Sequence, residues 1–197
     1  MKICYFGGSF DPPTLAHIEV AEKVIETCAI DEVWMAPCYK SLYGKSLALN
    51  HHREAMVLAA CEMSKYPDRI QLCSWELTNR IEGKTFDIME LMTGIYSQHQ
   101  LSFLIGGDNV DKVVSQWYRG KELVEKHNFI IVPRKGYTPQ TDWWKKENNF
   151  IAGTPENASD ISSTSVREQI RNGATEIKEL AKPVYDYIIQ HNLYKGE

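Results

Sequence analysis

A threonine and a histidine stand where a glycine-rich turn gives way to a helical pattern. Thr14 and His17 are three residues apart, so they share one face at the first turn of that helix. Free backbone N–H groups and the helix dipole favour anions there, and a hydroxyl and an imidazole can both donate to phosphate oxygens. The spacing indicates a phosphate site. The structural alternative is that Thr14 caps the helix and His17 is a surface histidine.

A second hydroxyl-rich segment lies near the end of the chain. Residues 162–165 read Ser-Ser-Thr-Ser and mark a helix start, with Arg167 in its first turn. The helix dipole disfavours a basic residue at this position, so an anion that shares the site would explain Arg167. A plain cap, with Ser165 and Glu168 as a capping box, accounts for the serines but not for the arginine.

Two double-glycine turns follow short apolar segments. Gly7-Gly8 comes after residues 2–6, and Gly106-Gly107 comes after residues 102–105. Ligands of open α/β sheets bind at the carboxyl ends of strands, where glycine lets the backbone approach a phosphate closely. Singly, each turn also fits an ordinary strand-to-helix connection. Two of them on strands expected to be neighbours favour a ligand site.

Familiar phosphate-binding motifs are excluded by their spacing. No GxGxxG fingerprint follows the first strand, and Gly83-Lys84-Thr85 lacks the earlier glycine of a P-loop because Thr78 stands there.

The pattern along the chain predicts an α/β fold with a parallel sheet. Short β-rich segments alternate with helical ones, which implies βαβ units with right-handed crossovers. We expect one domain over residues 1–197, with a helical C-terminal part from about residue 161. The expected strands are 2–6, 32–36, 69–73, 102–105, 128–132 and, more weakly, 149–152; the expected helices are 15–28, 56–63, 86–96, 163–172, 176–181 and 183–191.

Composition limits the function classes. The chain has 197 residues and a formal net charge of −4, which argues against a large basic face for DNA or RNA but not against a small anionic ligand. No run of about 18 apolar residues is present, so no membrane span is expected. Five cysteines without a CxxC pair predict reduced thiols in the cytoplasm or a similar reducing compartment.

Two signatures resemble those of a known family. Residues 8–17, GSFDPPTLAH, resemble the GxFxPx(H/T)xxH signature of the adenylyltransferase branch of the nucleotidyltransferase superfamily, and residues 161–167 resemble its ISSTxxR signature. Within that branch the chain is similar to the nicotinamide/nicotinic acid mononucleotide adenylyltransferases from Lys2 to about Tyr194. The resemblance implies a Rossmann-like sheet with helices on both faces. It also implies adenylyl transfer from ATP to the 5′-phosphate of NMN or NaMN, giving NAD or deamido-NAD plus pyrophosphate without a covalent enzyme intermediate.

The resemblance also assigns roles to residues. The expected catalytic residues are His17, Arg167 and Lys45. The expected ATP-binding residues are Gly8, Ser9, Phe10, Thr14, His17, Asp108, Ser163, Thr164 and Arg167. The expected residues on the mononucleotide side are Lys40, Thr85, Gly106, Asp108, Trp117 and Arg134. Lys40 and Lys45 both qualify as the basic residue after Pro37, and the spacing back from His52-Arg53 favours Lys45.

The resemblance implies Mg²⁺ bound with ATP, held by phosphates and water rather than by a protein cage. The expected partners are ATP and a pyridine mononucleotide, without nucleic acid or membrane, and a homo-oligomer is left open.

The chain departs from the family pattern at two places. Thr14 stands where many bacterial members have a first histidine, and no aromatic residue precedes Thr85 closely. Trp75, Trp143 and Trp144 are therefore alternatives for stacking on the pyridine ring.

Two alternative functions are left open. One is adenylyl transfer to another phosphate ester such as phosphopantetheine, and the other is a non-catalytic nucleotide-binding module. The sequence leaves the choice between amide and acid open.

Overall fold

A single parallel sheet forms the centre of the computed structural model, which describes residues 1–41, 44, 46–156 and 162–195. Its six strands lie in the order β3-β2-β1-β4-β5-β6. All six pair in parallel, and each overlaps a predicted strand. The strands are β1 (Lys2–Gly8), β2 (Glu32–Pro37), β3 (Ile70–Leu72), β4 (Gln100–Gly106), β5 (Asn128–Val132) and β6 (Phe150–Ile151).

Helices connect the strands and follow the sheet. They are α1 (Leu15–Thr27), α2 (Asn50–Glu62), α3 (Trp75–Asn79), α4 (Thr85–Ile95), α5 (Val110–Gln116), α6 (Gly120–Lys126), α7 (Ser163–Arg171) and α8 (Lys182–Gln190), with 3₁₀ turns η1 (Gly107–Asn109) and η2 (Trp143–Lys145). The predicted helices that correspond to α1, α2, α4, α7 and α8 are confirmed. The sequence pattern does not predict α3, α5 and α6, because these helices have only five to seven residues each and so show little periodicity.

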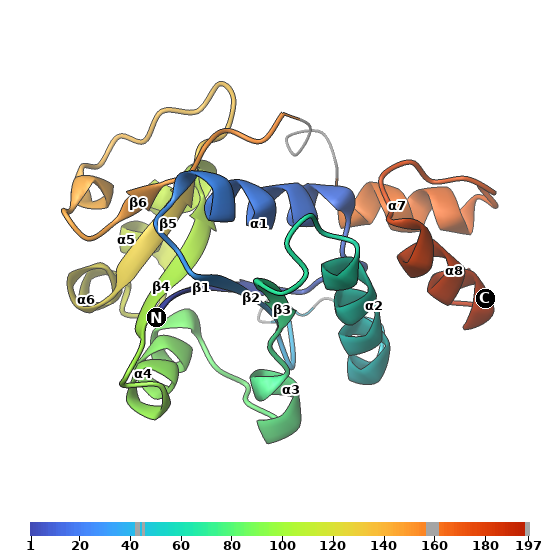
Figure 1. Cartoon of the computed structure of the whole chain (residues 1–197), viewed down its shortest axis with the longest axis horizontal. Coiled ribbons are helices and arrows are strands. Elements are labelled where there is room, and N and C mark those ends of the chain that lie inside the picture. The colour runs from blue at the N-terminus through green and yellow to red at the C-terminus, as the bar shows by residue number, and fades with distance from the viewer. Residues whose placement is uncertain (42–43, 45, 157–161, 196–197) are drawn as a thin grey trace.

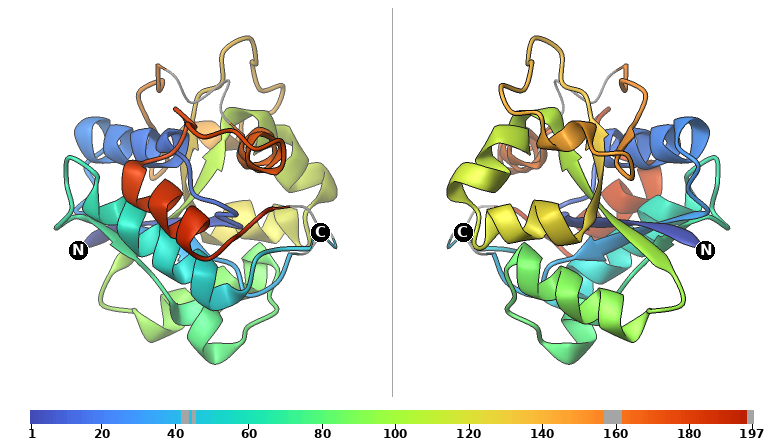
Figure 2. Two further views of the ribbon diagram at one scale, coloured as in Figure 1. Left: turned by 90° about the vertical axis from the view of Figure 1, so that its right-hand side faces the viewer. Right: turned by 90° about the vertical axis from the view of Figure 1, so that its left-hand side faces the viewer.

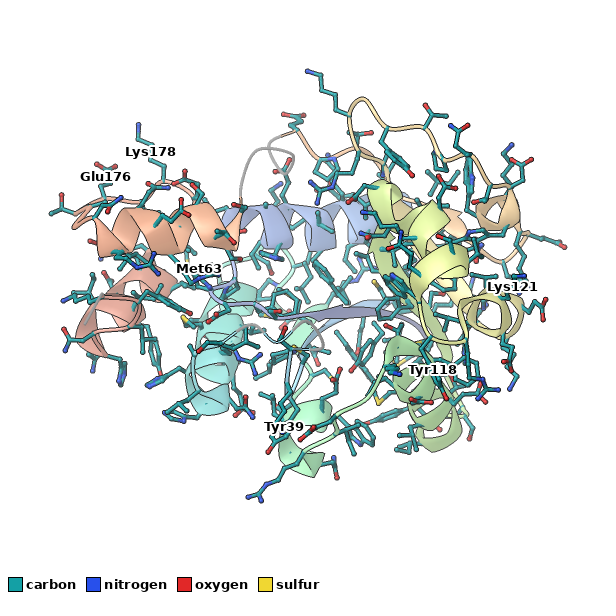
Figure 3. The ribbon with its side chains drawn as sticks, turned by 180° about the vertical axis from the view of Figure 1, so that it is seen from behind. Tyr39, Met63, Tyr118, Lys121, Glu176 and Lys178 are labelled. Carbon is teal, nitrogen blue, oxygen red and sulfur yellow. The ribbon has the colours of Figure 1, made fainter. Side chains whose placement is uncertain are left out.

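The predicted helix over residues 176–181 is wrong. The chain forms a turn there, between α7 and α8, where Figure 3 labels Glu176 and Lys178. A backbone hydrogen bond of this segment is made to another part of the chain, because the Glu179 carbonyl accepts from the Leu15 N–H at 2.8 Å. Its apolar spacing is real, because Ile177 and Leu180 are buried, but six residues are too few to stabilise a helix once tertiary contacts compete.

Side chains of the strands alternate between two hydrophobic cores. Cys4, Leu104 and Ile130 face α1, α2, α7 and α8, whereas Tyr5, Phe103 and Ile131 face α4, α5 and α6. Figure 1 shows α1 lying across one face of the sheet with α4 on the other, and Figure 2 shows α8 beside α2. Successive residues of one strand therefore reach opposite sides of the molecule.

All five cysteines are free, as the sequence predicts. Cys4, Cys28 and Cys61 are buried, whereas Cys38 and Cys73 are partly exposed. In the described part of the chain, no helix is long and apolar enough to span a membrane.

Gly120 offers a test of the packing between α5 and α6. A Cβ atom there would lie 1.7 Å from the carbonyl oxygen of Val113, so Gly120→Ala must push the two helices apart. We expect a loss of about 2–4 kcal/mol in the free energy of unfolding, measured by urea denaturation.

Gly94 is the matched control, because a Cβ on this α4 glycine meets no atom within 4 Å. Gly94→Ala should stabilise the protein by about 0.5–1 kcal/mol. Equal effects of the two substitutions would show that the α5–α6 contact is misplaced.

Candidate active site

The centre of the sheet is a topological switch point. β1 and β4 are neighbours, paired in register up to Tyr5 and Phe103, and β2 and β5 lie on their outer sides. The connections after β1 and β4 therefore leave in opposite directions, which opens a crevice at the carboxyl ends of the two strands. Both double-glycine turns lie at these ends, as predicted.

One cavity, here called the His17 cavity, opens on the face covered by α1 and has a volume of about 680 Å³. Its apolar wall comes from strand residues that point to this face. It is lined by Phe6, Ala16, His17, Val20, Leu104, Gly106, Val132, Pro133, Arg134, Lys135, Thr154, Pro155 and Glu156. An apolar wall beside an imidazole and a guanidinium suits a ligand with a flat base and phosphates.

A second cavity, the Trp117 cavity, opens on the other face and has a volume of about 600 Å³. It is lined by Tyr5, Gly7, Gly8, Ser9, Cys38, Lys40, Ser41, Glu76, Gly83, Lys84, Thr85, Ile88, Phe103, Gln116, Trp117 and Tyr118. Figure 3 shows Tyr39 and Tyr118 on the side of the sheet that carries α3 and α4. The predicted residues Lys40, Thr85 and Trp117 thus meet in one cavity.

His17 is oriented by the residue that begins its own helix. The backbone N–H of Thr14 donates to His17 Nδ1 at 3.0 Å, and the Thr14 hydroxyl oxygen lies 2.8 Å from the same atom. Because Nδ1 accepts a hydrogen bond, the proton of the neutral ring is on Nε2. Burial, with a smaller effect of the Arg134 charge, lowers the pKa of His17 to about 4. The ring is therefore a neutral Nε2–H donor at pH 7.

A buried arginine, Arg53, fixes the loop after β1 by hydrogen bonds. The sequence pattern was not read as indicating it. Arg53 of α2 is fully buried and donates to the carbonyl oxygens of Ser9 at 2.9 Å, Ala48 at 3.1 Å and Cys38 at 2.6 Å. It thereby ties the loop after β1 to the loop after β2. Its spacing from Met56, on the apolar face of α2, was an available signal.

The start of α7 is attached to the same loop. The Ser163 hydroxyl donates to the Pro12 carbonyl at 2.8 Å, and Arg167 Nη1 donates to the Asp11 carbonyl at 2.7 Å. The helix cap is Ser162, whose hydroxyl accepts from the Ser165 N–H, so the alternative of a capping box at Ser165 and Glu168 does not apply. Two segments that are about 150 residues apart in sequence thus meet beside the start of α1.

Asp108 and Arg134 form a pair at the end of β4 and β5. Arg134 Nε lies 3.2 Å from Asp108 Oδ1, and a Cβ atom on Gly106 would lie 2.6 Å from that oxygen. Glycine at position 106 therefore leaves room for the Asp108 carboxylate, which a larger residue would displace. Arg134 and Gly106 line the His17 cavity, on the opposite face from Thr85 and Trp117, with which the sequence analysis grouped them.

Comparisons with known proteins agree with this geometry. A family model described as cytidylyltransferase-like matches residues 5–169. Proteins of Oceanobacillus iheyensis and Bacillus pumilus, named probable nicotinate-nucleotide adenylyltransferase, are 32% and 33% identical over 98% and 99% of this chain, and 96% and 99% of their own lengths. The chain belongs to the cytidylyltransferase-like family. Within it the chain groups with the nicotinate-nucleotide adenylyltransferases.

A solved structure extends this likeness to three dimensions. The nicotinic acid mononucleotide adenylyltransferase of Plasmodium falciparum, complexed with NaAD, superposes with a TM-score of 0.84 at 28% identity, covering 98% of this chain and 97% of that one. The Rossmann-like fold predicted from the resemblance is confirmed for this family member. The individual residue roles stay predictions.

Four other residues named in the sequence analysis have different surroundings. Phe10 is a core residue with 2% of its surface exposed. Its ring packs edge-on against the His17 ring, with 5.1 Å between the two ring centres, so only its backbone is available to a nucleotide. Lys40 lies at the mouth of the Trp117 cavity in an ion pair with Glu82. Lys45 lies outside the described residues. The tryptophan considered for stacking at position 143 donates instead to the Val110 carbonyl at 3.0 Å.

The protonation of His17 can be tested by nitrogen NMR of the imidazole. We expect an unprotonated Nδ1 and a protonated Nε2 at neutral pH, with a titration midpoint of about 4 because burial disfavours the charged ring. A ring protonated on both nitrogens at neutral pH would contradict this assignment.

The same group adds a pH dependence to stability. Between the ordinary pKa of 6.5 and the folded value of about 4, the unfolded chain holds a proton that the folded chain does not, so acid favours unfolding. His17→Gln should therefore lose less stability than the wild type when pH falls from about 7 to about 5, measured by urea unfolding. Leu15→Gln, on the exposed side of the same turn, is the control.

Proposed function

We propose that the protein transfers the adenylyl group of ATP to the 5′-phosphate of nicotinic acid mononucleotide, forming deamido-NAD and pyrophosphate. One observation carries this proposal: two cavities on opposite faces of the sheet open at the carboxyl ends of β1 and β4, with His17 in the wall of one and Thr85 and Trp117 in the other. ATP fits the His17 cavity and the mononucleotide fits the Trp117 cavity. The names of the relatives support the acid form of the substrate.

In the proposed reaction an oxygen of the mononucleotide phosphate attacks the α-phosphorus of ATP. The bond from that phosphorus to the bridging oxygen breaks, and pyrophosphate leaves. Such transfers depend on positioning and on charge stabilisation. The Nε2–H of His17 is a preorganised donor for an α-phosphate oxygen. The start of α7, with Arg167, would hold the outer phosphates.

We propose that Mg²⁺ accompanies ATP in this reaction. Among the described residues, no group of three or more His, Cys, Asp or Glu side chains could hold a metal ion. We propose an ion that enters with the nucleotide and is bound mainly by phosphate oxygens and water. When bound, Mg²⁺ would neutralise the charge of the phosphates, while the residues of the chain position them.

An assay of pyrophosphate release tests the function. ATP is offered with NaMN, NMN or phosphopantetheine, and we expect release with NaMN. His17→Ala should lower kcat by about 10²–10³, because one transition-state donor is lost, with a smaller change in ATP binding.

The control for this assay is Leu58→Ala, an exposed substitution on α2. Release with phosphopantetheine alone would move the protein to another substrate class. No release with any acceptor would favour a non-catalytic nucleotide-binding module.

Lys84 supports acid over amide. It is the residue before α4, its Nζ lies 4.2 Å from the centre of the Tyr118 ring, and both residues line the Trp117 cavity. An ammonium group there attracts a pyridine carboxylate but gains little from a carboxamide. Lys84→Met should lower kcat/KM for NaMN by about tenfold and leave the value for NMN nearly unchanged.

Lys121→Met is the matched control, because Lys121 is a lysine of α6 outside the residues that line the cavity. It should change neither kcat/KM value. An equal loss for both substrates in Lys84→Met would assign Lys84 a role in general packing instead of in the recognition of the acid.

A further inference from the structure

Glu76 is a buried carboxyl group in the wall of the Trp117 cavity, and no role described above uses it. It lies in the first turn of α3 and is 5% exposed. Its Oε1 atom accepts a hydrogen bond from the Tyr5 hydroxyl at 2.6 Å. Ionising an acid with so little contact with water is costly, so its neighbours decide whether it carries a charge.

The titratable and charged groups around Glu76 come from four parts of the chain. They are Tyr5 of β1, Cys38 after β2, Cys73 after β3 and Arg53 of α2. Within the described residues Arg53 forms no ion pair with Glu76, because its N–H groups donate to main-chain oxygens and to Asn50. Burial raises the pKa of Glu76 to about 7, against the opposing effects of the Tyr5 and Tyr39 hydrogen bonds and the Arg53 charge.

The substrate proposed above changes this balance. NaMN brings a phosphate and a carboxylate into the cavity and displaces water from it. Both the added negative charge and the loss of water disfavour a carboxylate on Glu76. The neutral acid has no such conflict, because its carbonyl oxygen still accepts from Tyr5 and its O–H becomes a donor.

We propose that Glu76 takes up a proton when the mononucleotide enters the Trp117 cavity, and that the neutral acid, whose carbonyl oxygen still accepts from Tyr5, then keeps its place in the cavity wall beside the substrate. The inference rests on the proposed function. Glu76 is thus a positioning residue that couples substrate binding to pH. As pH rises above neutrality, binding must first supply a proton to Glu76, so the affinity for NaMN falls.

Calorimetry in buffers of different ionisation enthalpy measures this proton directly. NaMN is titrated into the wild-type protein and into Glu76→Gln at about pH 7.5. We expect the wild type to take up roughly half a proton more than the variant. The phosphate of NaMN titrates equally in both experiments, so the difference reports Glu76. Glu82→Gln, which removes an exposed carboxylate near the same cavity, should retain the wild-type uptake.

The pH profile of the reaction is the second readout. For the wild type, kcat/KM for NaMN should fall with a limiting slope of about tenfold per pH unit above 7. Glu76→Gln, whose carboxamide resembles the neutral acid, should remain active at pH 7 and lose this fall. A merely structural role would lower kcat/KM at every pH and leave the shape of the profile unchanged.

Tyr5→Phe is a second variant in case Glu76→Gln does not fold. It removes a hydrogen bond that favours the carboxylate, so the pH of greatest proton uptake should move upward. Unchanged uptake in both variants, with NaMN still bound, would overturn the inference alone. Failure of the wild type to bind NaMN would overturn the proposed function together with it.

Discussion

β1 and β4 lie side by side at the centre of a parallel sheet, and the chain leaves them in opposite directions. Because side chains alternate along a strand, Phe6 and Leu104 face α1 while Tyr5 and Phe103 face α4. Two cavities therefore form back to back, separated only by the thickness of the sheet. Glycines end both strands beside the two cavities: Gly106 lines the His17 cavity, and Gly7 and Gly8 line the Trp117 cavity. At Gly106 a single Cβ would already collide with Asp108.

Buried polar groups fix the loops around this opening. Arg53 carries its charge into the interior, which is unfavourable unless every N–H finds an acceptor. The carbonyls of Ser9, Ala48 and Cys38 and the side chain of Asn50 accept from it, which requires the loops after β1 and β2 to adopt this arrangement. Ser163 and Arg167, at the start of α7, donate hydrogen bonds to main-chain oxygens of the loop after β1. The candidate site is thus assembled by hydrogen bonds to main-chain oxygens more than by packing.

The sequence predicted the elements whose own residues determine them. Six strands and five helices have periodic apolar patterns, and Gly7-Gly8 and Gly106-Gly107 end strands that are neighbours. The sequence pattern could not predict α3, because five residues show no period. The burial of Glu76, which lies in this helix, was therefore not predicted either. Arg134 was grouped with Thr85, because the face that a residue reaches depends on strand register, which the motif does not contain. A helix was predicted instead of the turn at residues 176–181, because the sequence pattern does not show that the Glu179 carbonyl accepts from the distant Leu15 N–H.

The site combines local cations, such as Arg134 and Lys84, with a histidine that burial keeps neutral. The chain carries a net charge of −4, and its buried Arg53 is committed to main-chain oxygens. His17 is kept neutral by burial and accepts the Thr14 N–H. An uncharged donor loses little on desolvation, whereas an imidazolium would attract the ground-state phosphates as strongly as the transition state. In the role proposed for His17, a fixed N–H donor would stabilise the phosphate oxygens in the transition state without adding a charge to the ground state.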